Sequence, residues 1–565
     1  MTGDSGDFNG WQPALACPLV VGYTVRMRPL VALVFAVAGC LGTDVAAQPV
    51  RASCATTALL RMPPLAAATT GIGDRPSTTT ATIAHDTLPF VVHHDDARAT
   101  IAADVLVELA LAWTVQVDGA GFAPPLKDSA DEAGGFDDDG GDDRLDVYLA
   151  PLPRGVGAVT VSGRDVDPRP EHDRRAAFIV IDPDQPKDVI AVAAHHELQH
   201  ALQFAIDARE SVMWFEATAV AFEVRGRPDV TSWQDSVPAF QRQPHAPITA
   251  DGASFVPFSV ENDQRLEYGA ALFTLFLDDE YGDGDGVLLR RLWQGAAGLT
   301  VESDGANNTP DWLTAVELDA ELPEIAEILL SFAAWRALAP PRSVTGEGPD
   351  AYELGGASAL LGQRFVLANL SGTTRRPIEN EGPFVGGCHM SAASHPPLAQ
   401  PTPLFVHAES ESDPPRTLGA VIVSVDVAGG SVDVVRSAVD VVVDVTTEIS
   451  PGREVVVAVC DLSVTDADAD PVPSPIALTL GRTPFVGEGE GEGEGEGEGE
   501  GEGEEPVDCG CACDQTSSSS GPPSGDPRVM RKNIGIAAFA IGVFGFVVRA
   551  WRHRKRQRLY TKRPE

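Results

Sequence analysis

Basic residues are scarce in this chain of 565 residues. Lysine and arginine number 41 together, against 82 aspartates and glutamates, so the formal net charge is -41 at pH 7. Because a phosphate backbone is bound by clustered Lys and Arg, this balance argues against a nucleic-acid partner. Hydrophobic residues make up 43% of the chain and charged residues 22%, which is a mostly globular composition. The length exceeds what one core usually organises, so we expect two folded domains with appendages.

Basic residues are also absent from the N-terminus before Arg26. The segment that begins there, RMRPLVALVFAVAGCLGTDVAAQ, has a basic start, an apolar centre and small residues at its end, which is typical of a secretory signal peptide. We therefore assign residues 1–47 to an N-terminal extension and signal peptide, with Met27 as a candidate start and cleavage before Gln48. The alternative is lipidation at Cys40; ordinary cleavage is favoured because the other terminus carries a second candidate anchor.

Cysteine is rare in the expected mature folded region, which contains three of the eight cysteines. Export permits disulfides, and Cys388 with Cys460 is the candidate pair. Cys54, in the N-terminal segment 48–84, is then left unpaired, and we assign it no role from the sequence.

The C-terminal tail lacks the composition of a folded domain. Residues 487–505 are a Gly-Glu repeat, which buries no apolar surface and predicts an extended, disordered acidic spacer. Fifteen apolar residues, Ile534–Val548, then precede a basic end, which predicts a transmembrane segment with a cytoplasmic stop. Residues 509–565 resemble the C-terminal sorting signals of myxobacterial-type surface proteins. This resemblance implies display at the cell surface or outer membrane, or release from it, with a processing motif formed by Cys509, Gly510 and Cys511.

The folded part changes its pattern once. Residues 85–345 alternate short apolar runs with helical periodicity, which predicts an α+β domain. Expected strands are LPFVVHH, RLDVYLAPL, GAVTVSG and AAFIVID, and expected helices are 98–117, one from Asp188, 212–224, 268–280 and 323–338. Residues 350–485 follow period two, broken by Gly, Pro and Ser, which predicts an all-β sandwich. It carries no evident polar constellation, so we expect an accessory domain.

The stretch VIAVAAHHELQHALQFAID, from Val189, sets three histidines and a glutamate among apolar residues. On a helix His196 and His200 are one turn apart, and with Glu197 they form the H-E-x-x-H pattern. Two such imidazoles can hold one Zn²⁺, while Glu197 reaches the attacking water instead of the metal. The alternative, a satisfied polar helix face, leaves the glutamate and the apolar flanks unexplained. His195 points off this face and is expected to support a ligand or to be exposed.

The third histidine of metzincins is absent after His200, so glutamate is the third ligand on offer. HELQHALQF followed by WFEATAVAFE resembles gluzincin metallopeptidases, in which a second helix supplies a zinc-binding Glu. More closely, the chain resembles secreted myxobacterial-type zinc metalloproteases in PFVVHH, GFAPPLKD, GGDDRLDVYL, WFEATA and EYGAALFTLFLDDEYGDGDG. The resemblance implies a zincin-like domain that hydrolyses peptide bonds, with AAFIVID as the edge strand to which a substrate adds.

Three glutamates follow the pattern, and periodicity alone does not separate Glu216 from Glu223, seven residues later on the same helix face. The WFEATA string assigns Glu216 as the third ligand. Glu223 is then expected to hydrogen-bond a ligand histidine, and Glu210 to be solvated. Tyr268 can donate a hydrogen bond to the oxyanion, as a tyrosine does in related gluzincins; a buried tyrosine that opens a helix is the alternative.

The acidic turns FDDDGGDDRLD and DDEYGDGDG resemble calcium loops, but each lacks the acidic first position. Solvated turns are favoured, and Ca²⁺ is the second cofactor considered. Together these features predict an exported, surface-associated zinc metalloendopeptidase with a polypeptide substrate. Two alternatives stay open: a non-catalytic surface binding or adhesion protein on a zincin scaffold, which the intact Glu197 disfavours, and hydrolysis of a non-peptide amide or ester. The sequence predicts no oligomeric state.

Overall fold

The structure is a computed structural model that describes residues 53–54, 56 and 74–484, with gaps. The gaps are 128–139, 154, 164–173, 209, 249–262, 298–310, 341, 345–347, 353, 355–362, 366–372, 379–382, 384–385, 394–399 and 464–473. The chain divides into the compact units 1–489 and 490–565, and every described residue belongs to the first. The expected signal peptide, acidic spacer, sorting motif and membrane segment lie outside the described residues.

The N-terminal half of the described chain is built on a mixed sheet with the strand order β1-β5-β6-β4-β3-β2. Strands β3, β4 and β6 run parallel, whereas β2 and β5 are antiparallel to their neighbours β3 and β6. The strands are β1 (Ser53–Cys54), β2 (Ala81–Ala84), β3 (Phe90–His94), β4 (Leu145–Leu149), β5 (Val156–Ser162) and β6 (Ala177–Ile181). All four expected strands are therefore present.

The expectation that AAFIVID forms the edge strand is wrong. This segment is β6, which lies between β5 and β4. Each of its residues is buried. This agrees with its continuous apolar sequence, because a strand that is covered on both faces carries apolar side chains on both. Strand β5 lies outside β6 and also packs on the H-E-x-x-H helix, and among the described residues only the two-residue strand β1 pairs with its outer side.

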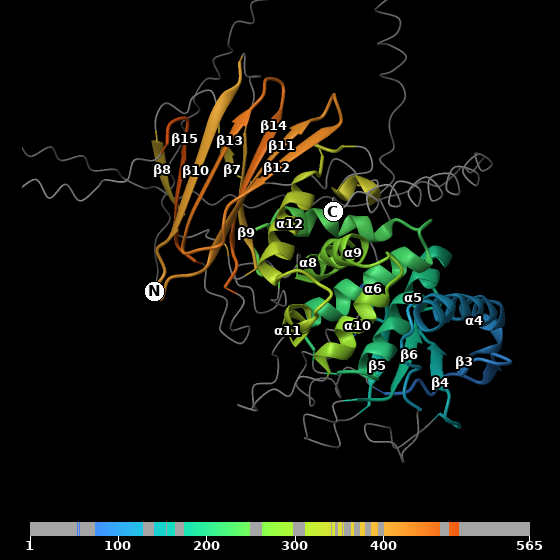
Figure 1. Ribbon diagram of the computed structural model, residues 1–565. Coiled ribbons are helices and arrows are strands. Elements are labelled where there is room, and N and C mark those ends of the chain that lie inside the picture. The colour runs from blue at the N-terminus through green and yellow to red at the C-terminus, as the bar shows by residue number, and fades with distance from the viewer. Residues whose placement is uncertain are drawn as a thin grey trace, which may run out of the picture. The chain divides into compact units, whose positions relative to one another are not determined.

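Three long helices pack on this sheet or on one another, and two of them, α5 and α6, carry residues of the site. Helix α4 (Ala99–Trp113), extended by a π-helical turn to Gly119, packs on β3 and on α5. Helix α5 (Lys187–Phe204) begins directly after Pro186, as predicted, and lies against β5 and β6. Helix α6 (Val212–Gly226) packs beside α5, as Figure 1 shows. Because the sheet, α4 and α6 all pack against α5, most of its residues are buried.

One helix in the described part is long and apolar enough to cross a membrane. It is Asp96–Gly119, with 24 residues and a mean hydropathy of 1.5. Core helices meet the same criterion, and Val105, Leu109 and Ala112 of this helix are buried in the protein core. Length and composition are therefore weak evidence for a span here.

The expected helix at 268–280 is in fact two helices, α8 (Asp263–Gly269) and α9 (Ala271–Glu280), and α12 (Ile325–Ala337) matches the helix expected at 323–338. Short helices α7 (Val237–Gln241), α10 (Val287–Ala296) and α11 (Asp311–Leu318) were not predicted. Their buried aromatic side chains join the core around α6: Trp214 and Trp312 stack with their ring centroids 4.3 Å apart.

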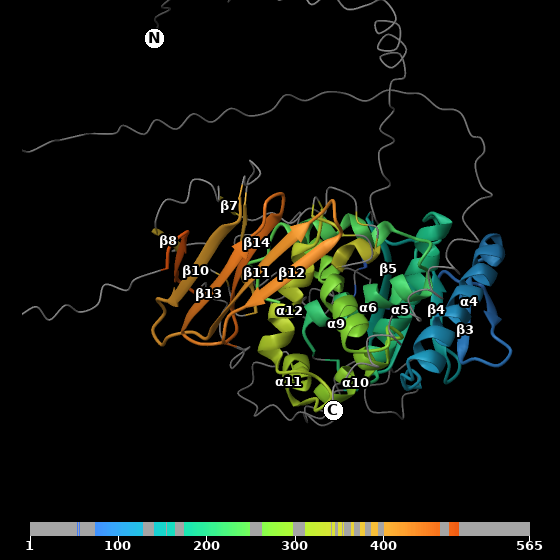
Figure 2. The same cartoon turned by 45° about the horizontal axis from the view of Figure 1, so that its top comes forward.

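The C-terminal part consists of two sheets, with strand orders β13-β10-β15-β8 and β12-β11-β14-β9-β7 among the described residues. A shared apolar core joins them through residues such as Val406, Ile422, Val445 and Leu478. Figure 2 shows α12 beside β11, and α12 packs on β11 and β14. The strands are β7 (Gln363–Phe365), β8 (Thr373–Ile378), β9 (Cys388–Ala393), β10 (Thr402–Ser410), β11 (Leu418–Asp426), β12 (Ser431–Arg436), β13 (Val442–Ile449), β14 (Glu454–Asp461) and β15 (Ile476–Gly481).

The candidate cysteine pair lies in this part. Cys388 on β9 and Cys460 on β14 are directly opposite each other in the ladder and form a disulfide.

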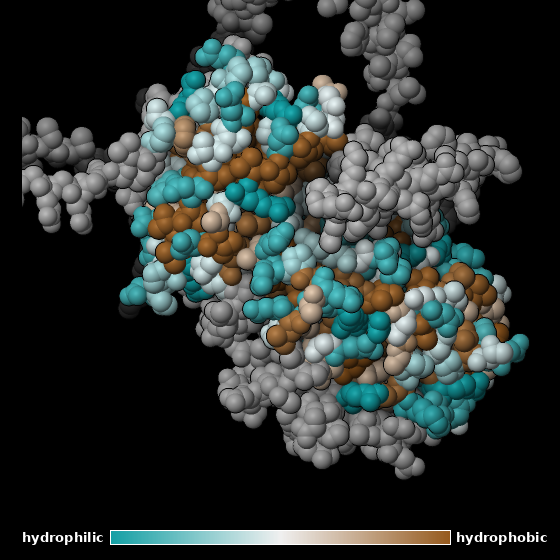
Figure 3. All heavy atoms as spheres, viewed as in Figure 1, coloured by the Kyte–Doolittle hydropathy of each residue, from teal (hydrophilic) through white to brown (hydrophobic). Residues whose placement is uncertain are grey.

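Figure 3 shows polar and apolar side chains interspersed over one face of the molecule. Among the described residues, the exposed large apolar side chains include Val434 and Val442 of the C-terminal sheets.

Leu198→Ala is expected to lower the free energy of unfolding by about 2–5 kcal/mol, because Leu198 of α5 is fully buried in the core and its removal leaves a cavity. Leu111→Ala is the matched control: this leucine of α4 is 48% exposed, so the change should stay within about 0.5 kcal/mol. Urea denaturation of both variants measures the difference. Equal midpoints would contradict the placement of α5 at the centre of the fold.

Candidate metal centre

Helix α5 brings two imidazoles together. The Nε2 atoms of His196 and His200 lie 3.0 Å apart, and the ring centroids are separated by 4.6 Å. Two nitrogen ligands of a tetrahedral zinc ion, each about 2.05 Å from it, are about 3.3 Å apart. The two Nε2 atoms therefore converge as the ligands of one metal ion do.

Helix α6 adds a carboxylate to this pair. Oε2 of Glu216 lies 3.1 Å from Nε2 of His196 and 3.8 Å from Nε2 of His200. The side chain is fully buried, and neither of its oxygens takes part in a well-aligned hydrogen bond. Because a buried carboxylate without such bonds is costly, a cation between these three residues fits the donor set.

The fourth member of the group is Cys54, a residue that the sequence left without a role. One donor atom from each of Cys54, His196, His200 and Glu216 can be chosen so that all four lie within 4.8 Å of one another. All four residues are buried. A buried group of two imidazoles, a carboxylate and a thiol can hold a metal ion. The one sequence signal was that Cys54 had no disulfide partner.

The electrostatics of the group also favour a cation. Burial lowers the pKa of His196 and His200, but contacts with the Cys54 sulfur and the Glu216 carboxylate outweigh it and raise both, that of His200 to about 10. Burial raises the pKa of Glu216, yet the two imidazoles hold it far below its ordinary value. Positive charge is therefore stabilised at the point where the four side chains meet.

The outer nitrogens of both histidines are oriented by hydrogen bonds. Nδ1 of His196 lies 2.6 Å from Oε1 of Glu223, and Nδ1 of His200 lies 2.7 Å from Oε1 of Gln203. These oxygens only accept, so in the neutral imidazoles that a metal ion requires each Nδ1 would carry the proton and each Nε2 lone pair would face the group. Gln203 is held in turn, because its amide donates to Thr218 and to a backbone carbonyl.

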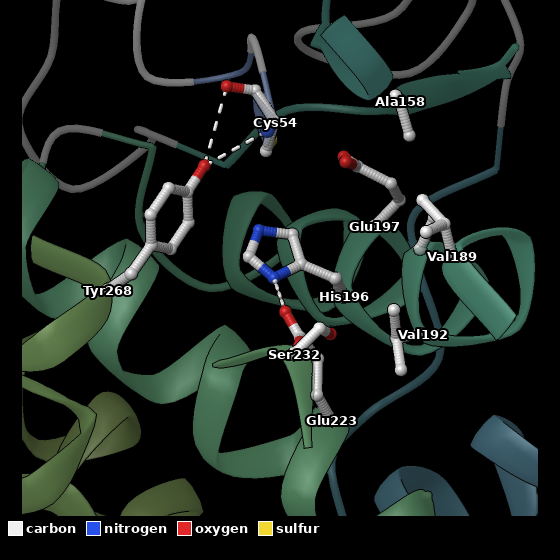
Figure 4. A pocket seen from close by; sticks show the side chains of 11 residues that line it. Cys54, Ala158, Val189, Val192, His196, Glu197, Glu223, Ser232 and Tyr268 are labelled. Carbon is white, nitrogen blue, oxygen red and sulfur yellow. Dashed lines mark hydrogen bonds and ion pairs between the residues drawn. The ribbon is translucent and has the colours of Figure 1, made fainter. Parts of the chain in front are cut away.

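Glu197 follows His196 directly on α5 and lines the same pocket, but it is not part of the group of four. Its Oε2 accepts hydrogen bonds from Thr160 of β5 at 2.7 Å and from Thr56 at 3.1 Å. Figure 4 shows Glu197 and His196 on the same pocket, with Tyr268 and Cys54 facing them. Glu197 therefore lies beside a group that could hold a metal ion without belonging to that group.

Tyr268 lines this pocket but is neither free nor at the start of a helix. It lies near the end of α8 and is 3% exposed. Its hydroxyl accepts a hydrogen bond from the backbone amide of Cys54 at 3.0 Å and lies 3.4 Å from the carbonyl oxygen of that residue. In this structure, therefore, Tyr268 binds backbone polar groups of the chain itself at the pocket.

Two neighbouring residues differ from the expectation. Glu210 is not solvated: it is 5% exposed, and its carboxylate accepts the backbone amides of Ser211 and Trp312, where α6 and α11 begin. His195 is fully buried, and its Nε2 lies 3.7 Å from Glu108 of α4. Neither side chain belongs to the group formed by Cys54, His196, His200 and Glu216.

In the acidic turn that the structure describes, the carboxylates of Asp278 and Asp279 contact other parts of the protein. In DDEYGDGDG, Asp278 pairs with Arg225 and accepts the backbone amide of Gly286, and Asp279 accepts the hydroxyl of Tyr352. These contacts favour a turn stabilised by the protein over a calcium loop. Part of the other turn, FDDDGGDDRLD, lies outside the described residues.

No protein-family model and no curated protein matches the chain. Among solved structures, a similarity is found to the pre-peptidase C-terminal domain of a collagenase from Bacillus anthracis. The identity is 11%, and the match covers 21% of this chain and 93% of that one. Its TM-score of 0.14 is too low to support an inference about fold or function.

Proposed function

We propose that this protein is an exported zinc metallopeptidase that hydrolyses peptide bonds. The observation that carries the proposal is the arrangement of four side chains. The Nε2 atoms of His196 and His200 on α5 converge with the carboxylate of Glu216 on α6, and Glu197 lies beside them on the pocket. A metal-binding site alone requires the first three residues. It does not require the carboxylate of Glu197.

His196, His200 and Glu216 would hold the metal, which is the two-histidine, one-glutamate set of catalytic zinc sites. When bound, zinc lowers the pKa of a water molecule to about 7 and polarises the substrate carbonyl. Glu197 accepts the proton of the attacking water and passes it to the leaving amine. Thr160 donates to Glu197 and so orients its carboxylate toward the pocket. Tyr268, whose hydroxyl now binds the backbone of Cys54, would donate to the oxygen of the scissile carbonyl.

The outer edge of β5 supports a peptide as the substrate. An extended peptide can add to a sheet edge through main-chain hydrogen bonds, and β5 packs directly against α5. The segment Ser53–Cys54 pairs with β5 in this way. A chain segment in extended conformation therefore fits beside the H-E-x-x-H helix.

The rival proposal is a surface binding protein that uses the same scaffold without catalysis. It predicts a metal site but no function for Glu197, whereas Glu197 is buried and bound by two threonine hydroxyls on the pocket. Hydrolysis of a non-peptide amide or ester would use the same residues. A β5 edge that accepts an extended segment favours the peptide.

The purified full chain is expected to contain about one zinc per molecule, because the donor set holds a single ion. Elemental analysis after purification without chelators measures this, and a peptide-library digest with and without a chelator measures hydrolysis. Cleavage that stops with chelator and returns with zinc is the expected result. A chain without any transition metal would contradict the proposal.

A further inference from the structure

Residues that are distant in sequence from α5 lie at the pocket. Ser53 and Cys54 form β1, which runs parallel to β5 on its outer side, with Ser53 opposite Val156 and Cys54 opposite Ala158. Among the described residues, nothing else pairs with this side of β5. If the protein is a peptidase, the segment occupies the edge that a substrate needs.

The side chains of this segment reach the groups that would carry out catalysis. The sulfur of Cys54 belongs to the buried group with His196, His200 and Glu216. Two residues later, Thr56 donates to the carboxylate of Glu197 at 3.1 Å. The segment therefore contacts both the metal-ligand group and the general base.

Backbone contacts hold the segment in this place. The amide of Thr160 on β5 donates to the hydroxyl of Thr56 at 2.8 Å, and the amide of Cys54 donates to Tyr268 at 3.0 Å. Cys54 and Thr56 are 7% and 1% exposed. The segment is thus packed into the pocket and does not merely lie over it.

Catalytic zinc sites have three protein ligands and an open fourth position, whereas structural sites have four. Three ligands come from α5 and α6, and the fourth donor comes from a segment of two strand residues on a sheet edge. We propose that the N-terminal segment that carries Ser53, Cys54 and Thr56 is an internal inhibitor: Cys54 is the fourth metal ligand and Thr56 blocks Glu197, so the enzyme is latent until the segment leaves. This inference rests on the proposed function.

Activation requires no redox chemistry. On release of the segment, the Cys54 sulfur would leave the metal ion and take up a proton, and a water molecule would take its place. Cleavage of the chain after Thr56, or competition by a ligand that displaces β1 from β5, would both have this effect. Tyr268 and Glu197 would lose their bonds to the segment at the same time and become available to a substrate.

The first test is spectroscopic and does not depend on activity. With Co²⁺ in place of zinc, the full chain should show a near-ultraviolet sulfur-to-cobalt charge-transfer band, and Cys54→Ala should lack it. Cys509→Ala, the same substitution in the C-terminal segment, is the matched control and should keep the band. A full-length chain that binds Co²⁺ without this band would overturn the proposal.

The second test compares peptide hydrolysis by the zinc-loaded full chains. Cys54→Ala should retain zinc and cleave a peptide library at least about tenfold faster than the parent, because more molecules then have the open position. Equal rates would overturn latency while leaving the peptidase proposal intact. Loss of zinc and of the folded state in Cys54→Ala would show a structural four-ligand site and also overturn it. If the band behaves as expected but no chain cleaves any peptide, the coordination by Cys54 stands and the peptidase proposal fails.

Discussion

Glu197→Gln is expected to leave zinc bound and to lower peptide hydrolysis by at least about a hundredfold. The amide cannot accept the proton of the attacking water, and Glu197 lies outside the group of metal-ligating side chains. The measurement is the rate of cleavage of a peptide by Cys54→Ala chains with and without this second change, together with their zinc content. The Cys54→Ala background removes the inhibition proposed above.

The matched control for this experiment is Asp188→Asn, an acid-to-amide change in the first turn of the same helix. Asp188 is exposed and lies two turns before the metal ligands, so zinc content and rate should both be unchanged. Near-normal turnover in Glu197→Gln would mean that another group activates the water. Loss of zinc together with activity would instead point to a ligand role for Glu197, against the geometry.

Glu216→Gln is expected to weaken zinc binding more than Glu223→Gln does. Glu216 faces Nε2 of both histidines, so its removal takes away a ligand and a negative charge at once. Glu223 contacts Nδ1 of His196 on the side remote from the group, where its removal should cost about 10–100-fold in affinity or activity. Titration of zinc against a chelator of known affinity measures both variants.

These two variants are matched controls for each other, because the same substitution is made on one buried helix face. The unfolding free energies of the metal-free forms should be recorded alongside, to separate a loss of affinity from a loss of fold. A larger loss of affinity in Glu223→Gln would contradict the assignment. It would mean that Glu223 moves to the metal when the ion binds.

Secondary structure near the site was largely predictable because its signals are local. Pro186 precedes α5 and the apolar runs form β3 to β6 as predicted, and the period-two region 350–485 contains β strands. The prediction failed where the same local sequence pattern is compatible with two different positions in the tertiary structure. The resemblance implied that AAFIVID is the edge strand, and its apolar run could not correct this, because such a run shows that a strand is buried but not which strands flank it. Glu210 was expected in solvent because its neighbours are polar, and it instead binds the amides that begin two helices.

The H-E-x-x-H pattern states the geometry of His196, Glu197 and His200 in advance, because one helical turn separates i from i+4 and the backbone alone sets that distance. Periodicity could not distinguish Glu216 from Glu223, since both project from the same face of α6. The packing of α6 on α5 separates them, with one carboxylate on each side of the His196 ring. Nothing local relates Thr56 to Glu197, which are 141 positions apart, or Cys54 to the histidines. Those contacts exist because β1 pairs with β5, and pairing between distant segments follows from the packing of the whole chain and not from any pattern within either segment.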